Sequence, residues 1–249
     1  MPTSSPKAIT DVLECISALA PRSILDVGCG WGQYGFLFRF HLDNGRWCER
    51  MNGALAGPSN LQIDTIEPYK PNLTEVHERL YDRIFVGDVR DEMDRMQDYD
   101  VIFLGGVIEH FEKDEGLALL RRLSQKANKG VVVLTPLGFA PQGAVGGNEG
   151  ERHKSGWFPA DFRAFPHTQV VLIGNVAGDL RVLAVICRSE ALRREVRWLY
   201  HPARCLLRQV CLSAFGTARG TKLFIAVSGL RNLLKPSGSE EPRRRTAAD

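Results

Sequence analysis

The most constraining feature of the sequence is an apolar strand that leads into a glycine-rich turn and then a helix, within residues 23–35. The segment has the letters SILDVGCGWGQYG, with glycines at positions 28, 30, 32 and 35. Glycine has no Cβ, so it adopts positive φ angles and lets a ligand lie against bare backbone. The helix that follows adds free N–H groups and the positive end of its dipole. The pattern predicts a βα unit that binds a nucleotide-like cofactor at the turn.

Strand-like and helix-like segments alternate along the rest of the chain. A glycine-rich loop, residues 136–158, precedes two apolar runs, 169–174 and 180–187, whose short connection permits only antiparallel pairing. We therefore expect an α/β fold with a mostly parallel seven-stranded sheet and an antiparallel C-terminal hairpin. The other predicted elements are strands at 23–27, 61–66, 83–86, 101–104 and 130–135, and helices at 7–20 and 112–126.

The composition fits one catalytic domain with an extension. The 249 residues, 44% of them hydrophobic, can bury one sizeable core, which we place in residues 1–188. From residue 188 onward there are 13 Lys and Arg against 5 Asp and Glu, a net charge of +8, which leaves −5 for residues 1–187. A mildly acidic body is not typical of a polyanion binder, so nucleic acid is not an expected partner. We predict a basic amphipathic helical extension at 189–236 and a disordered tail at 237–249.

The start of the chain and the cysteines favour a cytoplasmic protein. The first twenty residues lack the basic start and long apolar run of a secretory signal. The six cysteines include no CxxC pair, so neither a zinc knuckle nor a disulfide scaffold is indicated. The basic extension either packs on the domain or lies peripherally at the inner membrane surface. Dimerisation is a further alternative, and the oligomeric state stays open.

The glycine turn carries a family resemblance. Residues Asp26 to Gly32, with the letters DVGCGWG, resemble motif I of the class I S-adenosylmethionine-dependent methyltransferases. The resemblance implies a Rossmann-like fold and S-adenosylmethionine as the cofactor. It also implies that Gly28, Gly30 and Gly32 contact the methionine part of the cofactor, while Asp26 orients its amino group. The alternative is a turn that only joins a strand to a helix.

Two further acidic residues follow the second and third predicted strands. A carboxylate at Glu67 can accept both ribose hydroxyl protons, as in dinucleotide-binding sheets. Asp88 matches the family position that takes the adenine amino group, and we include its neighbour Val89 among the cofactor-binding residues. Each acid has the alternative role of capping a loop or a helix.

The acceptor is expected beyond the fourth and fifth strands. The residues Val107 to His110 resemble the Val-Ile-Glu-His segment of ubiquinone-type methyltransferases. The imidazole of His110, with a free pKa of about 6.5, can take the proton of a hydroxyl that attacks the methyl group. Alternatively, His110 starts a helix and bonds to backbone. Glu109 either orients His110, binds the substrate or lies in solvent.

The long loop after the fifth strand supplies the remaining candidates. Its segment from His153 to Trp157 resembles the His-x-Ser-x-Trp signature of a bacterial methyltransferase group linked to glycan or surface-polymer pathways. A loop longer than about 20 residues in a compact domain is usually functional or disordered. We predict His153 as a second candidate base. Gln142, Asn148 and Trp157 are predicted to bind a sugar or an aromatic ring, with Trp157 alternatively a core anchor.

These features predict in-line O-methylation of a small-molecule or glycan-like acceptor, with His110, His153 and Glu109 as the catalytic candidates. Two alternatives stay open. Small-RNA 2′-O-methyltransferases also have Glu-His after strand four and another histidine after strand five, which together hold magnesium. Their additional glutamate falls at Gly106 here, so no metal site is predicted. The other alternative is a cofactor-binding protein without turnover.

Overall fold

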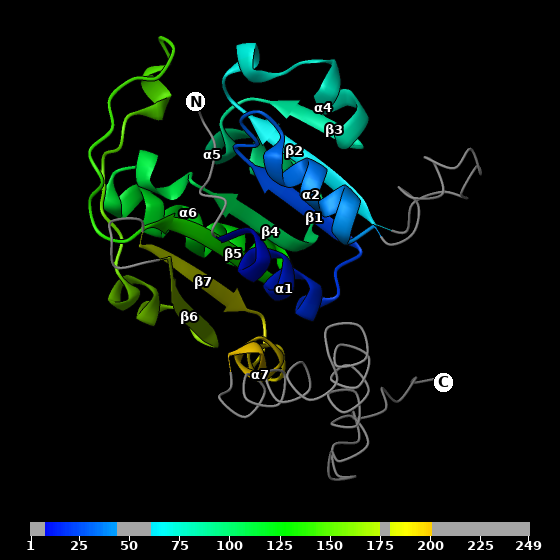
Figure 1. The fold of residues 1–249 in the computed structure, drawn as a ribbon, viewed down its shortest axis with the longest axis vertical. Helices are drawn as coiled ribbons and strands as arrows, with labels where there is room; N and C mark the ends of the chain where they lie inside the picture. Colours follow the sequence, from blue (N-terminus) through cyan, green and yellow to red (C-terminus); the bar gives the residue numbers. More distant parts are fainter. Residues whose placement is uncertain (1–7, 44–60, 175–179, 201–249) are drawn as a thin grey trace, which may run out of the picture. The chain divides into compact units, whose positions relative to one another are not determined.

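The computed structural model describes residues 8–43, 61–174 and 180–200. Within these ranges one seven-stranded sheet has the order β3-β2-β1-β4-β5-β7-β6 (Figure 1). Strands β1 to β5 are parallel, and β7 runs antiparallel to both β5 and β6. The predicted sheet with its antiparallel C-terminal hairpin is confirmed. The strands are β1 (Ser23–Val27), β2 (Gln62–Glu67), β3 (Arg83–Val86), β4 (Tyr99–Gly105), β5 (Ala127–Pro136), β6 (Thr168–Ile173) and β7 (Arg181–Cys187).

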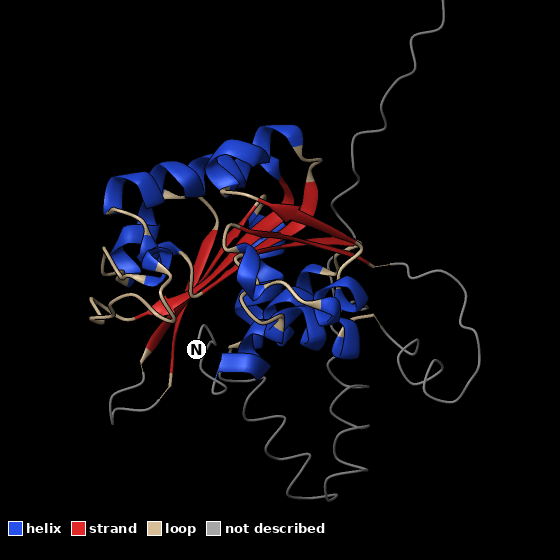
Figure 2. Ribbon diagram, turned by 90° about the horizontal axis from the view of Figure 1, so that it is seen from above, coloured by secondary structure: helices blue, strands red, loops and turns tan. Residues whose placement is uncertain are grey.

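Helices cover both faces of the sheet (Figures 1 and 2). Parallel crossovers are right-handed, so the direction of the chain decides the face on which each helix lies. Helices α2 and α4, which follow β1 and β2, lie on one face of the sheet. Helices α5 and α6, which follow β3 and β4, lie on the other. Helix α1 contacts α2 and therefore lies on the first face. The bounds are α1 (Ile9–Leu19), α2 (Gln33–His41), α4 (Glu75–Leu80), α5 (Val89–Glu92), α6 (Lys113–Lys126) and α7 (Glu190–Leu199).

The core lies between the sheet and these helices. Helix α6 buries Leu119, Leu120 and Leu123, which recur at helical spacing, in the cluster that also contains the apolar residues of β5. Residues 131–134 of β5 are all fully buried, as expected for a strand covered on both faces. The strand begins at Ala127, three residues before the predicted start, because Ala127 pairs with Tyr99 across an irregularity at the start of β4.

The strand order decides where a ligand can bind. The chain passes from β1 outward to β2 and β3, and then returns to β4 and β5 on the opposite side of β1. Open α/β sheets bind ligands in the crevice at such a reversal, beyond the carboxyl ends of the strands. The glycine turn follows β1, and the segment from Gly106 to His110 follows β4. Both predicted halves of the site therefore lie at this crevice.

The predicted extension at 189–236 is described only in part. Its first residues form α7, in which Val196 is buried, and the compact unit that contains the sheet ends at Arg197. Residues 201–236 and the predicted tail at 237–249 lie outside the described residues. In the described ranges, no helix combines the length and apolar character required to cross a membrane.

Candidate active site

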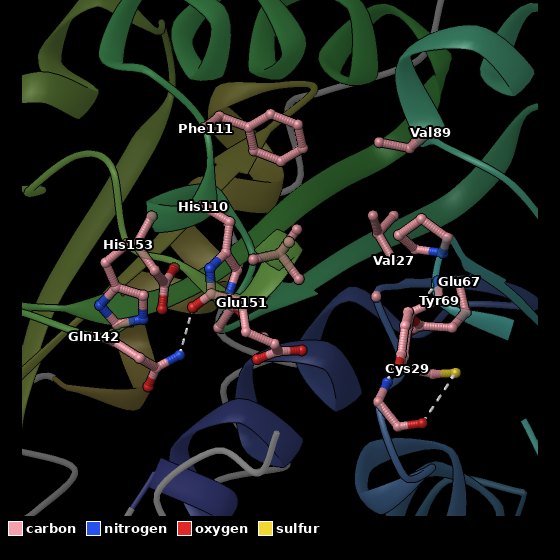
Figure 3. Close-up of a pocket in the computed structure, with 18 of the residues that line it drawn as sticks. Val27, Cys29, Glu67, Tyr69, Val89, His110, Phe111, Gln142, Glu151 and His153 are labelled. Atoms are coloured by element: carbon pink, nitrogen blue, oxygen red, sulfur yellow. Dashed lines mark hydrogen bonds between the residues drawn. The ribbon is translucent and has the colours of Figure 1, made fainter. Parts of the chain in front are cut away.

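A cavity of about 730 Å³ lies at the carboxyl ends of β1, β2 and β4, where the strand order reverses. Ligand pockets typically enclose about 300–1,000 Å³, so the space suits a cofactor and part of a second reactant. Figure 3 shows Glu67 and Cys29 on one side and His110 and His153 on the other. One cavity thus joins residues predicted for the cofactor to residues predicted for the acceptor.

The glycine turn lines the cofactor side of this cavity. Gly28 and Gly30 have φ angles of +67° and +54°, a region that residues with a Cβ seldom adopt. A Cβ on Gly28 would also come within 2.7 Å of a methyl group of Val107. The structure differs from the prediction at Gly32, which is not among the cavity-lining residues. Gly32 instead faces α4, where a Cβ would lie 3.0 Å from Leu80.

Asp26 is a buried carboxyl group at the end of β1. It is only 2% exposed, lines the cavity and accepts a 2.6 Å hydrogen bond from the Tyr81 hydroxyl at Oδ2. Burial raises the pKa of Asp26 to about 7, the hydrogen bond from Tyr81 opposes this shift, and the charge of Glu67 adds to it. A cationic ligand beside Asp26 would therefore favour its charged form.

Glu67 connects the ends of β2 and β1. Its Oε2 accepts the N–H of Gly30 at 3.0 Å, and its Oε1 accepts the N–H of Tyr69 at 3.0 Å and the amide of Asn72 at 3.2 Å. Burial raises the pKa of Glu67, and these hydrogen bonds oppose the shift. A carboxylate offers about four lone-pair sites. The side chain is therefore held in place with capacity left for a ligand hydroxyl.

Asp88 performs the capping role that was its alternative. It precedes α5 and accepts the backbone N–H of Arg90 at 2.8 Å, while both carboxylate oxygens bond to the Arg90 guanidinium. Burial raises the pKa of Asp88, but the bonds from Arg90 outweigh burial and leave it below the usual value. Asp88 and the buried Val89 both line the cavity. Asp88 can therefore contact a ligand in the cavity while it caps α5.

His110 has a backbone carbonyl at each ring nitrogen. Its Nε2 lies 3.1 Å from the oxygen of Gly106, and its Nδ1 lies 3.3 Å from the oxygen of Arg152. Burial lowers the pKa of His110, and the nearby His153 lowers it further. A neutral imidazole carries one N–H, so the lone pair of the other nitrogen faces a backbone carbonyl oxygen. It is therefore not directed at a substrate hydroxyl group.

His153 has a different arrangement of ring contacts. Its Nδ1 is in hydrogen-bonding contact with the carbonyl oxygen of Ala140, and its ring centroid lies 5.0 Å from that of His110. A carbonyl oxygen only accepts hydrogen bonds, so we assign the proton to Nδ1. This tautomer leaves a lone pair on Nε2, the state that a general base requires. His153 also lines the cavity.

Glu109 is buried and bonds away from both histidines. Its Oε2 accepts a 3.0 Å hydrogen bond from the Thr135 hydroxyl, and burial raises its pKa to about 7. Its backbone oxygen accepts the N–H groups of Lys154 and Ser155, which ties the loop to the end of β4. The described residues contain no group of three or more His, Cys, Asp or Glu side chains placed to hold a metal ion. The carboxylate of Glu109 is thus directed at Thr135, whereas the rings of His110 and His153 contact backbone carbonyl oxygens.

The predicted substrate residues divide into two groups. Gln142 and Asn148 line the cavity, where the Gln142 amide donates to the oxygen of Glu151 and Asn148 accepts the N–H of Gly150. Trp157, predicted to bind substrate, is 0% exposed and does not line the cavity. It packs in the core against Phe162, so its alternative role as a core anchor is the one observed.

Three residues at or near the cavity were not predicted. The hydroxyl of Tyr34, a cavity-lining residue, is buried and has no hydrogen-bond partner in the described part of the chain. The carboxylate of Glu151 lies between the two halves of the cavity in Figure 3, and burial, together with the charge of Glu67, raises its pKa. Tyr81, which directly follows α4, donates a hydrogen bond to Asp26. Only Tyr34 had a sequence signal, because it directly follows the glycine turn.

Comparisons with known proteins identify the fold. No protein-family model matches the chain, and no curated protein matches it in sequence. The methyltransferase domain of bacterial CtHen1 matches in structure with a TM-score of 0.50 and 16% identity, over 73% of this chain and 97% of that one. The chain has the fold of the class I methyltransferases. The N-terminal domain of EvdMO1, solved in the presence of SAH and D-fucose, matches with a TM-score of 0.51 and 15% identity, over 74% and 84% of the two chains.

Proposed function

We propose that this chain transfers a methyl group from S-adenosylmethionine to an oxygen atom of a small-molecule or glycan-like acceptor. The observation that carries the proposal is the single cavity that reaches from the glycine turn and Glu67 to His110 and His153. A transferase that forms one covalent bond between two reactants needs such a shared space, because both must be held in contact.

The cofactor side of the cavity suits each part of S-adenosylmethionine. The bare backbone at Gly28 and Gly30 accommodates the methionine part, and the carboxylate of Asp26 suits its amino group. Glu67 retains capacity for the ribose hydroxyls, and Asp88 and Val89, which line the same cavity, suit the adenine. The cofactor supplies a methyl group bound to a positively charged sulfur, which an oxygen nucleophile can attack in line.

The histidine pair suits the acceptor side. The acceptor oxygen forms a bond to the methyl carbon as the carbon–sulfur bond breaks, and its proton must leave. The Nε2 of His153 is suited to receive this proton because the Ala140 carbonyl holds the proton on Nδ1. His110, which lies between two carbonyl oxygens, orients the loop through the backbone of Arg152. Holding the reactants together can contribute about 7–11 kcal/mol in favourable intramolecular reactions.

Calorimetry tests the cofactor half of the proposal. We expect the protein to bind S-adenosylmethionine and S-adenosylhomocysteine, and Glu67→Ala to weaken binding by about ten- to a hundredfold, because it removes a buried charged hydrogen-bonding group. Gly30→Val should abolish binding, because valine is strained at a φ of +54°. Glu149→Ala changes an exposed glutamate that does not line the cavity and should bind like the parent. Parent-like binding by both site variants would contradict the placement of the cofactor.

Transfer of a labelled methyl group tests turnover. The protein is incubated with methyl-labelled cofactor and host extract, and the labelled product is isolated to identify the methylated atom. D-Fucose, present in the EvdMO1 structure, is a defined sugar with which to begin. Loss of activity with a chelator would instead favour the metal-dependent RNA methyltransferase. Cofactor binding without any labelled product would favour the non-catalytic alternative.

A further inference from the structure

Tyr81 contacts the proposed cofactor site from outside the cavity. It follows the last residue of α4, is buried, and does not line the cavity. Its hydroxyl donates a hydrogen bond of 2.6 Å to Oδ2 of Asp26, a residue 55 positions earlier. The contact joins the second βα unit to the carboxyl group at the end of the first strand.

The last glycine of the turn makes room for this contact. A Cβ on Gly35 would collide with the hydroxyl and ring carbon of Tyr81. Gly35 has no unusual φ angle and does not line the cavity, so neither backbone strain nor the cofactor requires a glycine there. The space that Gly35 leaves is occupied by the Tyr81 ring, which lets the hydroxyl reach Asp26.

The same helix also holds the backbone of the glycine turn. His77, one turn before Tyr81, is buried and lies roughly parallel to the Tyr81 ring, with centroids 6.1 Å apart. Its Nδ1 accepts the N–H of Thr74, so its Nε2 carries the proton and donates to the oxygen of Gly30 at 3.0 Å. Helix α4 therefore fixes both the carboxyl group and the turn that face the cavity.

We infer that Tyr81 is a positioning residue for the cofactor, because it fixes the Asp26 carboxylate in the orientation that leaves Oδ1 for the amino group of S-adenosylmethionine. The inference rests on the proposed function, since it assumes that this cofactor occupies the cavity. Tyr81 acts through Asp26 and has no contact with the cavity itself.

The contact also affects the charge of Asp26. The titratable groups that interact with Asp26 are Tyr81 directly after α4, Glu67 on β2, Cys29 in the turn and Tyr34 on α2. Burial raises the pKa of Asp26 to about 7, whereas the Tyr81 hydrogen bond lowers it. Removal of the hydroxyl should therefore raise this pKa further. Less of the charged carboxylate would then be present at neutral pH to bind a positively charged amino group.

The substitution Tyr81→Phe tests the inference, with Tyr99→Phe as the matched control. Tyr99 is also buried and donates a 2.6 Å hydrogen bond to a buried aspartate, Asp64, but neither residue lines the cavity. If loss of the Tyr81 hydroxyl raises the Asp26 pKa by about one unit, the ionised fraction near pH 7 falls about fivefold. We expect S-adenosylmethionine binding to weaken by at least that factor near neutral pH. The part of the loss that comes from protonation of Asp26 should disappear about two pH units higher, where Asp26 is ionised in both proteins.

Calorimetry across this pH range measures the effect, and ¹³C NMR titration of the Asp26 carboxyl group measures the pKa without any ligand. Tyr99→Phe should match the parent in both, while thermal unfolding should show that the two variants lose comparable stability. An unchanged Asp26 pKa in Tyr81→Phe, or S-adenosylmethionine binding that matches the parent near neutral pH, would overturn the inference. If the parent protein does not bind S-adenosylmethionine, the proposed function fails. The NMR titration needs no ligand, so an Asp26 pKa that is the same in Tyr81→Phe and in the parent would overturn the role of Tyr81 independently of the proposed function.

Discussion

At the scale of single residues, His110 and His153 differ in the contacts of their ring nitrogens. Both lie in one cavity with their rings in edge contact, so position alone does not distinguish them. The carbonyl oxygens of Gly106 and Arg152 face the two nitrogens of His110, whereas His153 has one carbonyl contact, at Nδ1. Both residues are candidate bases on the basis of the sequence, and the hydrogen bonds favour His153.

We predict that His153→Ala lowers kcat by about 10²- to 10⁴-fold, the usual loss for a general base. His110→Ala should lower kcat less, because His110 acts through the loop backbone. Neither variant should change the dissociation constant of S-adenosylmethionine by more than about twofold, since the hydrogen-bonding groups of the cofactor half are intact. Steady-state kinetics on the acceptor found by label transfer, together with calorimetry, measure both effects. A larger loss of kcat in His110→Ala would contradict the assignment.

At the scale of elements, the loop between β5 and β6 is anchored to α6. The ring of Trp157 packs so closely on α6 that a Cβ on Gly116 would lie 2.7 Å from it. The ammonium of Lys113 lies 4.1 Å from the Trp157 ring centroid and donates to the oxygen of Gly156 and to Asp161. These contacts hold the end of the loop that carries His153.

We predict that Trp157→Ala lowers the free energy of unfolding by about 3–5 kcal/mol, the usual range when a buried aromatic side chain is truncated. The adjacent Phe158 is 52% exposed, so Phe158→Ala is the matched control and should cost about 1 kcal/mol or less. Urea unfolding monitored by far-UV circular dichroism measures both. A stable Trp157→Ala variant with weakened acceptor binding would restore the predicted substrate-binding role.

Elements with a strong local pattern were predicted well, and those defined by long-range contacts were not. The bounds of β1 and β3 match the prediction to the residue, because an apolar run bordered by turn residues specifies a strand locally. The role of Trp157 could not be decided in this way. An aromatic residue in a glycine-rich loop fits a binding face and a core equally, and only the position of α6 distinguishes the two.

At the scale of the whole molecule, the charge of the chain is distributed unevenly. Residues 201–249 contain 9 Lys and Arg against 3 Asp and Glu, a net charge of +6, although the complete chain carries only +3. Basic residues near an anionic membrane surface contribute about 1 kcal/mol each to binding. We propose that this part of the chain attaches the protein peripherally to the inner membrane surface, which would suit a lipid-linked glycan acceptor.

Sedimentation with liposomes tests this attachment. We predict that the complete protein pellets with anionic vesicles at low salt, and that a version ending at Tyr200 does not, because it lacks the net charge of +6. This version keeps α7 with its buried Val196, and far-UV circular dichroism checks that it retains the fold. Neutral vesicles and high salt are the controls. Equal sedimentation of the two proteins would contradict membrane attachment through this part of the chain.

The sequence by itself determined the class of the fold, the place of the cofactor turn and the order of the acidic residues after the first three strands. These features are local, since strand periodicity and glycine conformation depend on a few neighbouring residues. The tertiary structure alone decided that Tyr81 and His77 support the turn, that Gly32 faces α4, that Trp157 belongs to the core and that His153 has the freer nitrogen. Each of these depends on residues distant in the chain, and burial and hydrogen-bond partners at such distances leave no periodic signal in a single sequence.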